Sequence, residues 1–283
     1  MRLLDVARSQ HHRLYAELLQ VGCLGTEGNG LGGMAGQLFG QANNAGVRLG
    51  GHGRYTLEQR LDTPQLLDQF SCAVPEHAHT IATANIGHPG CFATAALLAT
   101  VPLLRSGLTD SELFVTGITG STGSGRSPQP GTHHPERHSN LYAYKPLAHR
   151  HAPEIAALSE TASGRQAHIH FVPHSGPFAR GIHVTVQAKA SQRVSDGQLR
   201  AAFENAYADS PFVSVVSGTP RLKSVVGSNY CQIGVACSED AVVVMSVIDN
   251  LVKGAAGGAM QWMNRLWQLP ETTGLDMPAP GWT

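Results

Sequence analysis

The sequence predicts an α+β fold in which helices cover one face of an antiparallel sheet. The chain has 283 residues, 42% of them apolar, which is enough for a packed core. From residue 75 onward, helical and strand patterns follow one another without strict βαβ alternation. Segments 230–237 and 241–249 both read as strands, and only Ser-Glu-Asp separates them, which is typical of an antiparallel hairpin.

Each predicted element has its own signal. Apolar residues recur at helical spacing over 92–107, and the segment ends at a glycine. Segment 112–119 reads as a buried strand, and a polar loop rich in Gly, Ser, Pro and His follows it. A proline in the first turn supports a helix at 151–164, and Ser195 and Gln198 have the spacing of a capping box. The other predicted elements are strands at 166–173, 181–189, 212–216, 230–237 and 241–249, and helices at 195–209 and 252–269.

The first 74 residues read differently. Their first 20 residues are compatible with an amphipathic helix, but glycine is dense after that and no helical or strand period lasts. Gly28, Gly30 and Gly33 match the G-x-G-x-x-G pattern of dinucleotide-binding loops. No hydrophobic strand leads into them, so we attribute this match to the local glycine content.

Composition excludes several classes of function. The 20 basic and 20 acidic residues balance and form no basic stripe, which argues against a nucleic-acid partner. The apolar runs are too short to span a bilayer, and the first 20 residues lack the apolar region of a signal peptide, so we expect a cytoplasmic protein. The five cysteines have no regular spacing, which argues against a disulfide framework.

Cys91 is the first candidate for chemistry. It follows a Pro-Gly turn at residues 89–90 and begins the predicted helix. A thiol at this position lies near unpaired backbone N–H groups and the positive end of the helix dipole, which lower a thiol pKa and favour the nucleophilic thiolate. The alternative is a buried cysteine that only fills core space.

A nucleophilic thiol needs a base or proton donor. The candidates are His149 and His151, which lie at the start of the helix predicted at 151–164 with Arg150 between them. The alternative is that both are solvated loop histidines. The His-x-His spacing also occurs in zinc sites, but nine of the 15 histidines lie between residues 133 and 183, and no paired cysteine ligands accompany them. We therefore expect no metal.

A loop at 119–127, Thr-Gly-Ser-Thr-Gly-Ser-Gly-Arg-Ser, follows the strand at 112–119 and is called the Gly/Ser loop below. Gly and Ser let backbone N–H groups approach an anion or a cofactor ring, and Arg126 is placed to face a phosphate or carboxylate. The alternative is an ordinary flexible loop.

Five segments in order resemble one family of enzymes. They are the Pro-Gly-Cys-Phe-Ala-Thr-Ala at 89–95, the Gly/Ser loop, the segment 140–155 with Tyr144 and His-Arg-His, the Gly-Ser-Asn at 227–229, and the Asp-Asn-Leu-Val-Lys-Gly-Ala-Ala-Gly at 249–257. The whole is similar to N-acetyl-γ-glutamyl-phosphate reductase, of the semialdehyde dehydrogenase superfamily. The resemblance implies a semialdehyde-dehydrogenase-type catalytic and dimerisation domain, with an antiparallel sheet, that assembles as a homodimer or homotetramer.

The resemblance also implies a reaction. A cysteine thiolate attacks the acyl phosphate of an N-blocked glutamate, phosphate leaves, and NADPH reduces the thioester to the semialdehyde in arginine biosynthesis. By matching position, Cys91 is the nucleophile and His149 the acid/base, with His151 as the second candidate. The implied substrate-binding residues are Arg126, Arg150 and Tyr144, and the implied cofactor-binding residues are Ser121, Gly123, Gly125 and Asn229.

The N-terminal part departs from the family, whose members begin with a Rossmann-type α/β domain. We therefore expect residues 1–74 to be a truncated or degenerate remnant of the NADP-binding region, 75–253 the catalytic and dimerisation domain, and 254–283 a C-terminal helix and tail returning towards the cofactor side. Two alternatives remain. One is a non-catalytic relative that folds and oligomerises without binding the cofactor. The other is a variant that acts on carrier-protein-blocked glutamyl or aminoadipyl phosphate, because the segment 132–140, Thr-His-His-Pro-Glu-Arg-His-Ser-Asn, resembles that of such variants.

Overall fold

A computed structural model describes residues 70–281 except 79, 81–82 and 84. The three glycines at 28, 30 and 33, and most of the predicted remnant at 1–74, lie outside the described residues. The helices are α4 (Cys91–Ser106), α5 (His134–Arg137), α6 (His151–Ser163), α7 (Asp196–Ala206) and α8 (Gly257–Leu266). The strands are β1 (Phe70–Cys72), β2 (Asn85–Gly87), β3 (Thr109–Thr119), β4 (Tyr142–Ala143), β5 (His168–Ser175), β6 (Ile182–Ala190), β7 (Val213–Val215), β8 (Cys231–Cys237) and β9 (Ala241–Ile248).

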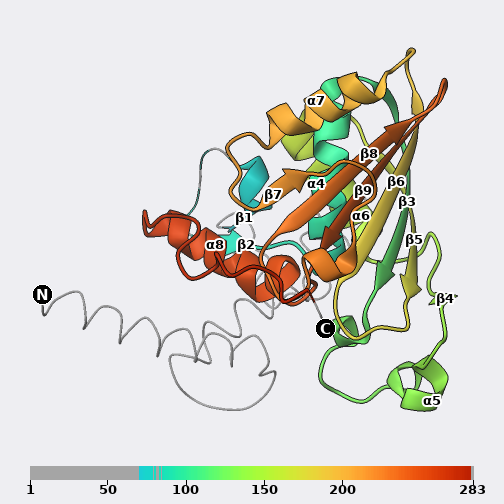
Figure 1. The fold of residues 1–283 in the computed structure, drawn as a ribbon, viewed down its shortest axis with the longest axis vertical. Coiled ribbons are helices and arrows are strands. Elements are labelled where there is room, and N and C mark those ends of the chain that lie inside the picture. Colours follow the sequence, from blue (N-terminus) through green and yellow to red (C-terminus); the bar gives the residue numbers. More distant parts are fainter. Residues whose placement is uncertain (1–69, 79, 81–82, 84, 282–283) are drawn as a thin grey trace, which may run out of the picture.

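The strands from β3 to β9 form one seven-stranded sheet in the order β4-β5-β3-β6-β9-β8-β7 (Figure 1). Four neighbouring pairs are antiparallel, as predicted, and two, β3–β5 and β7–β8, are parallel. The α+β prediction is confirmed, and the sheet is mixed because α6 carries the chain back between β3 and β5. β1 and β2 form a separate parallel pair.

Helix α4 is the centre of the core. Every residue from Phe92 to Leu104 is buried, because the helix packs against α6 and α7 on its sides and against β3, β6 and β9 of the sheet. The helix ends at Gly107, whose φ of 69° is the left-handed conformation that glycine adopts at helix ends. Its first residue is Cys91.

Pro102 lies inside α4, where it has no N–H to donate to the carbonyl of Leu98. The Tyr207 hydroxyl donates to that carbonyl instead, at 2.6 Å. The structure therefore satisfies the buried acceptor that the proline leaves open, and the helix continues.

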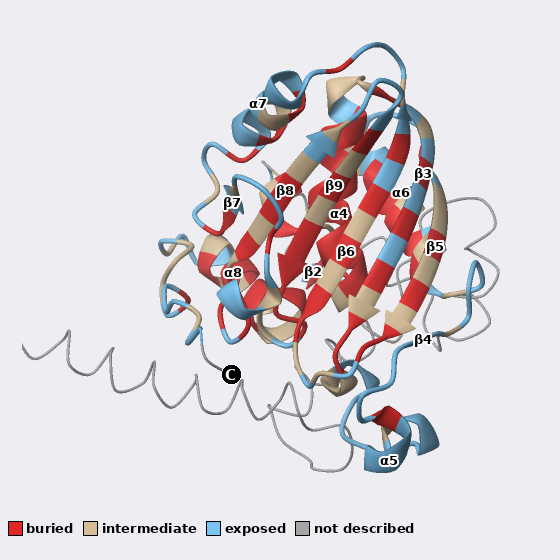
Figure 2. Ribbon diagram, turned by 45° about the vertical axis from the view of Figure 1, so that its right-hand side comes forward, coloured by how far each residue is buried: buried red, intermediate tan, exposed pale blue. Residues whose placement is uncertain are grey.

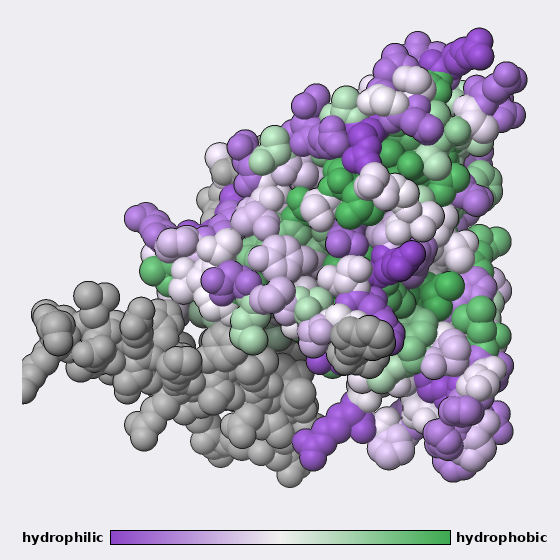
Figure 3. All heavy atoms as spheres, viewed as in Figure 1, coloured by the Kyte–Doolittle hydropathy of each residue, from purple (hydrophilic) through white to green (hydrophobic). Residues whose placement is uncertain are grey.

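The other face of the sheet carries no helix in Figure 2, which looks onto it with α4 behind the strands. Burial alternates along β3, so that Leu113 and Val115 face α4 while Phe114 and Thr116 are exposed. Phe114 is 52% exposed and stacks on His170, with ring centroids 4.8 Å apart. Hydrophobic residues also reach the surface among hydrophilic ones in Figure 3.

In the described part of the chain, no helix combines the length and apolarity needed to cross a bilayer.

The predicted closing helix at 252–269 is found as two pieces. Val252–Ala256 form a π-helical turn, called the π turn below, and α8 follows it directly. The Asp249 carboxylate accepts from the backbone N–H groups of Leu251 and Val252, both at 2.8 Å, which fixes the start of the π turn. Such turns are rare and often occur at functional sites.

Candidate active site

Cys91 begins α4 because Gly90 ends the extended segment before it and accepts the first helical bond, from Thr94 N–H to Gly90 O at 2.7 Å. The thiol is partly buried. On one side the π turn approaches so closely that a Cβ on Gly254 would lie 2.7 Å from Cys91 Cβ. The two histidines of the His-Arg-His segment contact the residues on either side of Cys91 in sequence, Gly90 and Phe92.

His151 lies directly against the residue before the thiol. A Cβ on Gly90 would lie 2.3 Å from His151 Cε1 and 3.1 Å from His151 Nε2, so only glycine leaves room for this ring. His151 is buried, and its Nδ1 lies 2.5 Å from Glu154 Oε2. The other Glu154 oxygen accepts from Gly90 N–H at 3.1 Å. One carboxylate therefore orients the imidazole and the backbone that leads into Cys91.

His149 has different surroundings. Its ring contacts Phe92, Tyr144 and Phe171, with centroids 6.1, 5.5 and 5.4 Å away, and the His151 ring at 5.0 Å. Burial, followed by the neighbouring His151 and Arg150, lowers the pKa of His149 to about 4. The imidazole is therefore neutral near neutral pH, a form that can accept a proton.

The expected lowering of the Cys91 thiol pKa is wrong for this chain. Burial raises it to about 11, and the Glu154 carboxylate adds to the rise. The backbone N–H groups of Phe92 and Cys91 act in the expected direction, as does Arg150, but they do not overcome the loss of solvation. The N–H groups at the start of the helix stabilise the thiolate, but a base beside Cys91 is needed to remove the thiol proton.

The Gly/Ser loop is not arranged as an open anion cradle. Ser121 N–H donates to Phe178 O at 2.9 Å and Thr122 N–H to Ala179 O at 3.0 Å, and Gly123 and Gly125 donate to carbonyls within the loop. The interpretation that these N–H groups await an anion is therefore wrong. What the loop offers is an exposed backbone at Gly125, whose φ is 83° and where a Cβ would meet nothing within 4 Å.

The other predicted residues differ in exposure. Arg150 is exposed, yet it acts on the pKa of both Cys91 and Tyr144, so its charge lies in their neighbourhood. Tyr144 is half-buried, and Arg126 is exposed in the Gly/Ser loop. Asn229 is buried and donates to Gln261 Oε1 at 3.2 Å. Among the described residues its Oδ1 has no hydrogen-bond partner, and Gly257 packs closely against it.

The sequence reasoning missed Glu154, although His-x-x-Glu at the start of a helix places the two side chains on one face. It also missed His88, three residues before the thiol. His88 is buried, with Nε2 at 3.3 Å from Thr94 Oγ1 and 3.2 Å from Lys253 O, so it ties the start of α4 to the π turn. No local signal marks that contact, because 165 residues separate His88 from Lys253.

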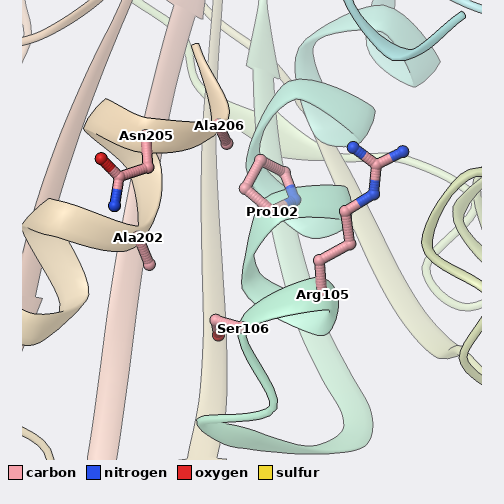
Figure 4. Close-up of a pocket in the computed structure, with 6 residues that line it drawn as sticks. All are labelled: Pro102, Arg105, Ser106, Ala202, Asn205 and Ala206. Carbon is pink, nitrogen blue, oxygen red and sulfur yellow. The ribbon is translucent and has the colours of Figure 1, made fainter. Parts of the chain in front are cut away.

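A cavity of about 340 Å³ lies elsewhere, between α4 and α7 (Figure 4). Its lining residues are Pro102, Arg105, Ser106, Ala202, Asn205 and Ala206. Pro102 is roughly 16 Å along α4 from Cys91, and the Arg105 guanidinium already donates to Ala162 O at 2.6 and 3.0 Å. This cavity is not part of the site around Cys91.

Residues 91–250 match the family described as semialdehyde dehydrogenase, dimerisation domain, and the chain belongs to this family. Its relatives include N-acetyl-gamma-glutamyl-phosphate reductases: that of Bacillus cereus is 43% identical over 195 residues, and that of Acidithiobacillus ferrooxidans 42% over 218. These matches cover 67% and 75% of this chain and 56% and 63% of the relatives, so the chain spans less than two thirds of their length. The resemblance found in the sequence is confirmed.

Solved structures share the fold. Aspartate semialdehyde dehydrogenase II from Vibrio cholerae has a TM-score of 0.56 at 14% identity, covering 71% of this chain and 69% of that one. The aspartate semialdehyde dehydrogenase from Francisella tularensis also has a TM-score of 0.56, at 13% identity, over 77% of this chain and 79% of that one. At these identities, the likeness supports the architecture alone.

Proposed function

We propose that this chain carries the catalytic part of an NADPH-dependent reductase that converts N-acetyl-γ-glutamyl phosphate to N-acetyl-glutamate semialdehyde in arginine biosynthesis. The single observation that carries the proposal is the His151 ring, bonded to Glu154 and packed against Gly90, the residue before Cys91, which fits a base with its orienting group beside a nucleophile. The relatives named above are reductases of this substrate, which supports the choice.

The residues divide the chemistry between them. Glu154 accepts a hydrogen bond from the Nδ1–H of His151, which leaves the His151 Nε2 free to take the thiol proton of Cys91. The thiolate attacks the acyl carbon, a C–S bond forms, the bond from that carbon to the phosphate oxygen breaks, and phosphate leaves. His149, Tyr144 and Arg150 surround the attacked group, and Arg150 offsets the charge of the phosphate.

NADPH supplies the hydride that reduces the thioester when it is bound. The residues proposed to hold its nicotinamide half are Ser121, Gly123 and Gly125 of the Gly/Ser loop, which is open at Gly125, and Asn229. After hydride transfer, the protonated His151 returns its proton to the Cys91 sulfur as the aldehyde departs.

Membership in a dimerisation-domain family supports an oligomer. We propose a homodimer or homotetramer that uses the face of the sheet opposite α4, where Phe114 and His170 are stacked and exposed to solvent.

One observation favours the alternative of a relative that folds and oligomerises without turnover. Since burial raises the pKa of the Cys91 thiol to about 11, the resting sulfur is protonated at neutral pH. A reductase with this thiol depends on His151 to remove the proton during the reaction.

Acyl-phosphate-dependent oxidation of NADPH by the full chain tests the proposal, followed by absorbance, with Cys91→Ser as the control. We expect turnover in the parent and none above background in the variant. A folded, oligomeric chain with neither turnover nor saturable NADPH binding supports the alternative, and equal rates in both chains contradict the role of Cys91.

A further inference from the structure

The π turn that packs on Cys91 carries one member of a buried charge pair. Lys253 is 0% exposed, and its ammonium donates to Glu76 Oε1 and, at 2.6 Å, to Gln261 Oε1. The Gln261 amide in turn donates to Glu76 Oε1 at 3.0 Å and to Glu271 Oε2 at 2.9 Å. A buried ion pair is costly to desolvate and is often no more stabilising than apolar residues of the same volume, so stability alone is a weak reason for it.

The backbone of Gly254 packs on the candidate nucleophile, and the carbonyl of Lys253 contacts His88. Lys253 O lies 3.2 Å from His88 Nε2, and Gly254 packs on Cys91 so closely that no Cβ fits between them. Gly258 does the same against the His88 ring, where a Cβ would lie 2.3 Å from two ring atoms. The π turn and α8 therefore dock on the start of α4 through backbone atoms, with Lys253 as the polar anchor beside the contact.

The carboxylate end of the pair belongs to a third segment. Residues 73–78 carry Glu76, and α8 holds this segment through a bond from Trp262 Nε1 to Ala73 O at 3.0 Å and through the Arg265 guanidinium, which donates to the carbonyls of Pro75 and Ala78. In sequence, Glu76 and Lys253 are 177 residues apart. The Lys253–Glu76 pair thus joins the segment 73–78 to the π turn that contacts Cys91.

We infer that the Lys253–Glu76 pair is a positioning device for the nucleophile: it holds the π turn against Cys91 and so keeps the sulfur aligned with the N–H groups at the start of α4. The inference rests on the proposed role of Cys91 but not on turnover. The inference is that the directional bonds of this pair set the position of the π turn. Replacing both charges by apolar residues can restore folding, but it cannot restore those bonds.

The test is the rate of iodoacetamide alkylation at Cys91, resolved from the other cysteines by peptide mass spectrometry and measured across pH on the full chain. Lys253→Met is expected to slow alkylation roughly 10-fold and to move its pH profile upward. The matched control Lys189→Met removes an exposed lysine from β6 and leaves rate and profile unchanged. The double variant Glu76→Leu/Lys253→Met is expected to regain melting temperature without regaining the alkylation rate.

A second variant disturbs the contact without touching the charges. Gly254→Ala places a methyl group against Cys91 and is expected to slow alkylation and shift its profile as Lys253→Met does. The control Gly197→Ala lies in α7, where a Cβ meets nothing within 4 Å. If Lys253→Met does not fold, the alkylation rate of Gly254→Ala is used to test whether the contact of the π turn with Cys91 controls the thiol.

Parent-like alkylation in Gly254→Ala or in folded Lys253→Met overturns the inference, as does full recovery of the rate in the double variant. Because alkylation needs neither NADPH nor acyl phosphate, these outcomes are readable even where the proposed reductase activity is absent.

Discussion

Two buried carboxylates, Glu154 and Glu76, reach the surroundings of Cys91 through different partners. Glu154 reaches an imidazole, His151, that lies against the residue before the thiol, so it belongs to proton transfer. Glu76 reaches an ammonium, Lys253, whose next residue packs on the thiol's own Cβ, so it belongs to position. Two acidic side chains of the same chemistry therefore serve different ends because their partners differ: one orients an imidazole, a group used in proton transfer, and the other fixes an ammonium that anchors a turn.

The largest effect is expected on the proton-transfer side. His151→Asn removes the base and should lower kcat/KM roughly 100-fold or more, the range of general acid–base catalysis. His149→Asn, the control, removes an aromatic contact and should act mainly on KM. Steady-state kinetics of both variants measures the difference. The reverse order of effects would assign the proton transfer to His149.

Glu154→Gln separates orientation from charge. Losing the orienting carboxylate should lower kcat about 10-fold or more, by analogy with acid–imidazole pairs. The Glu154 charge also raises the pKa of the Cys91 thiol, so its removal should lower that pKa and move the alkylation profile to lower pH. Glu112→Gln, on an exposed strand position, is the control. An unchanged profile would show that Glu154 does not act on the sulfur.

The last prediction concerns acid stability on the Lys253 side. Burial and Lys253 lower the pKa of His88 to about 4, below the value of 6.5 for an exposed histidine. The unfolded chain binds the extra proton, so the stability is present above about pH 6.5 and is lost as pH falls towards 4. Between pH 7 and 5 this linkage removes about 2 kcal/mol.

Urea unfolding at both pH values checks this prediction. His88→Gln should lose less stability between pH 7 and 5 than the parent does, while His138→Gln, at an exposed position, should behave like the parent. Equal losses in the parent and His88→Gln would place the acid-sensitive group elsewhere.

Local patterns predicted much of the fold. The helix at Cys91, the hairpin β8–β9 and the capping box at Ser195 all rest on spacings within one segment, and all are present. The parallel pairing of β3 with β5 was missed, because pairing depends on where α6 returns the chain. The π turn was read as plain helix, since its cause, the cap from Asp249, acts from outside the periodic segment.

The site divides in the same way. Cys91 and the His-Arg-His segment were found, and the structure brings them together. The direction of the thiol pKa was wrong, because helix position is visible in sequence and burial is not. The Lys253–Glu76 pair was beyond sequence reasoning, since nothing local connects residues at that separation.

The central claim is that Cys91 is the sulfur that receives the acyl group. Mass spectrometry of the full chain, quenched in acid after incubation with N-acetyl-γ-glutamyl phosphate and no NADPH, tests it most directly. The account predicts a hydroxylamine-sensitive acyl adduct on the peptide that carries Cys91. An unmodified Cys91 peptide in a chain that nonetheless releases phosphate through a different residue would contradict it.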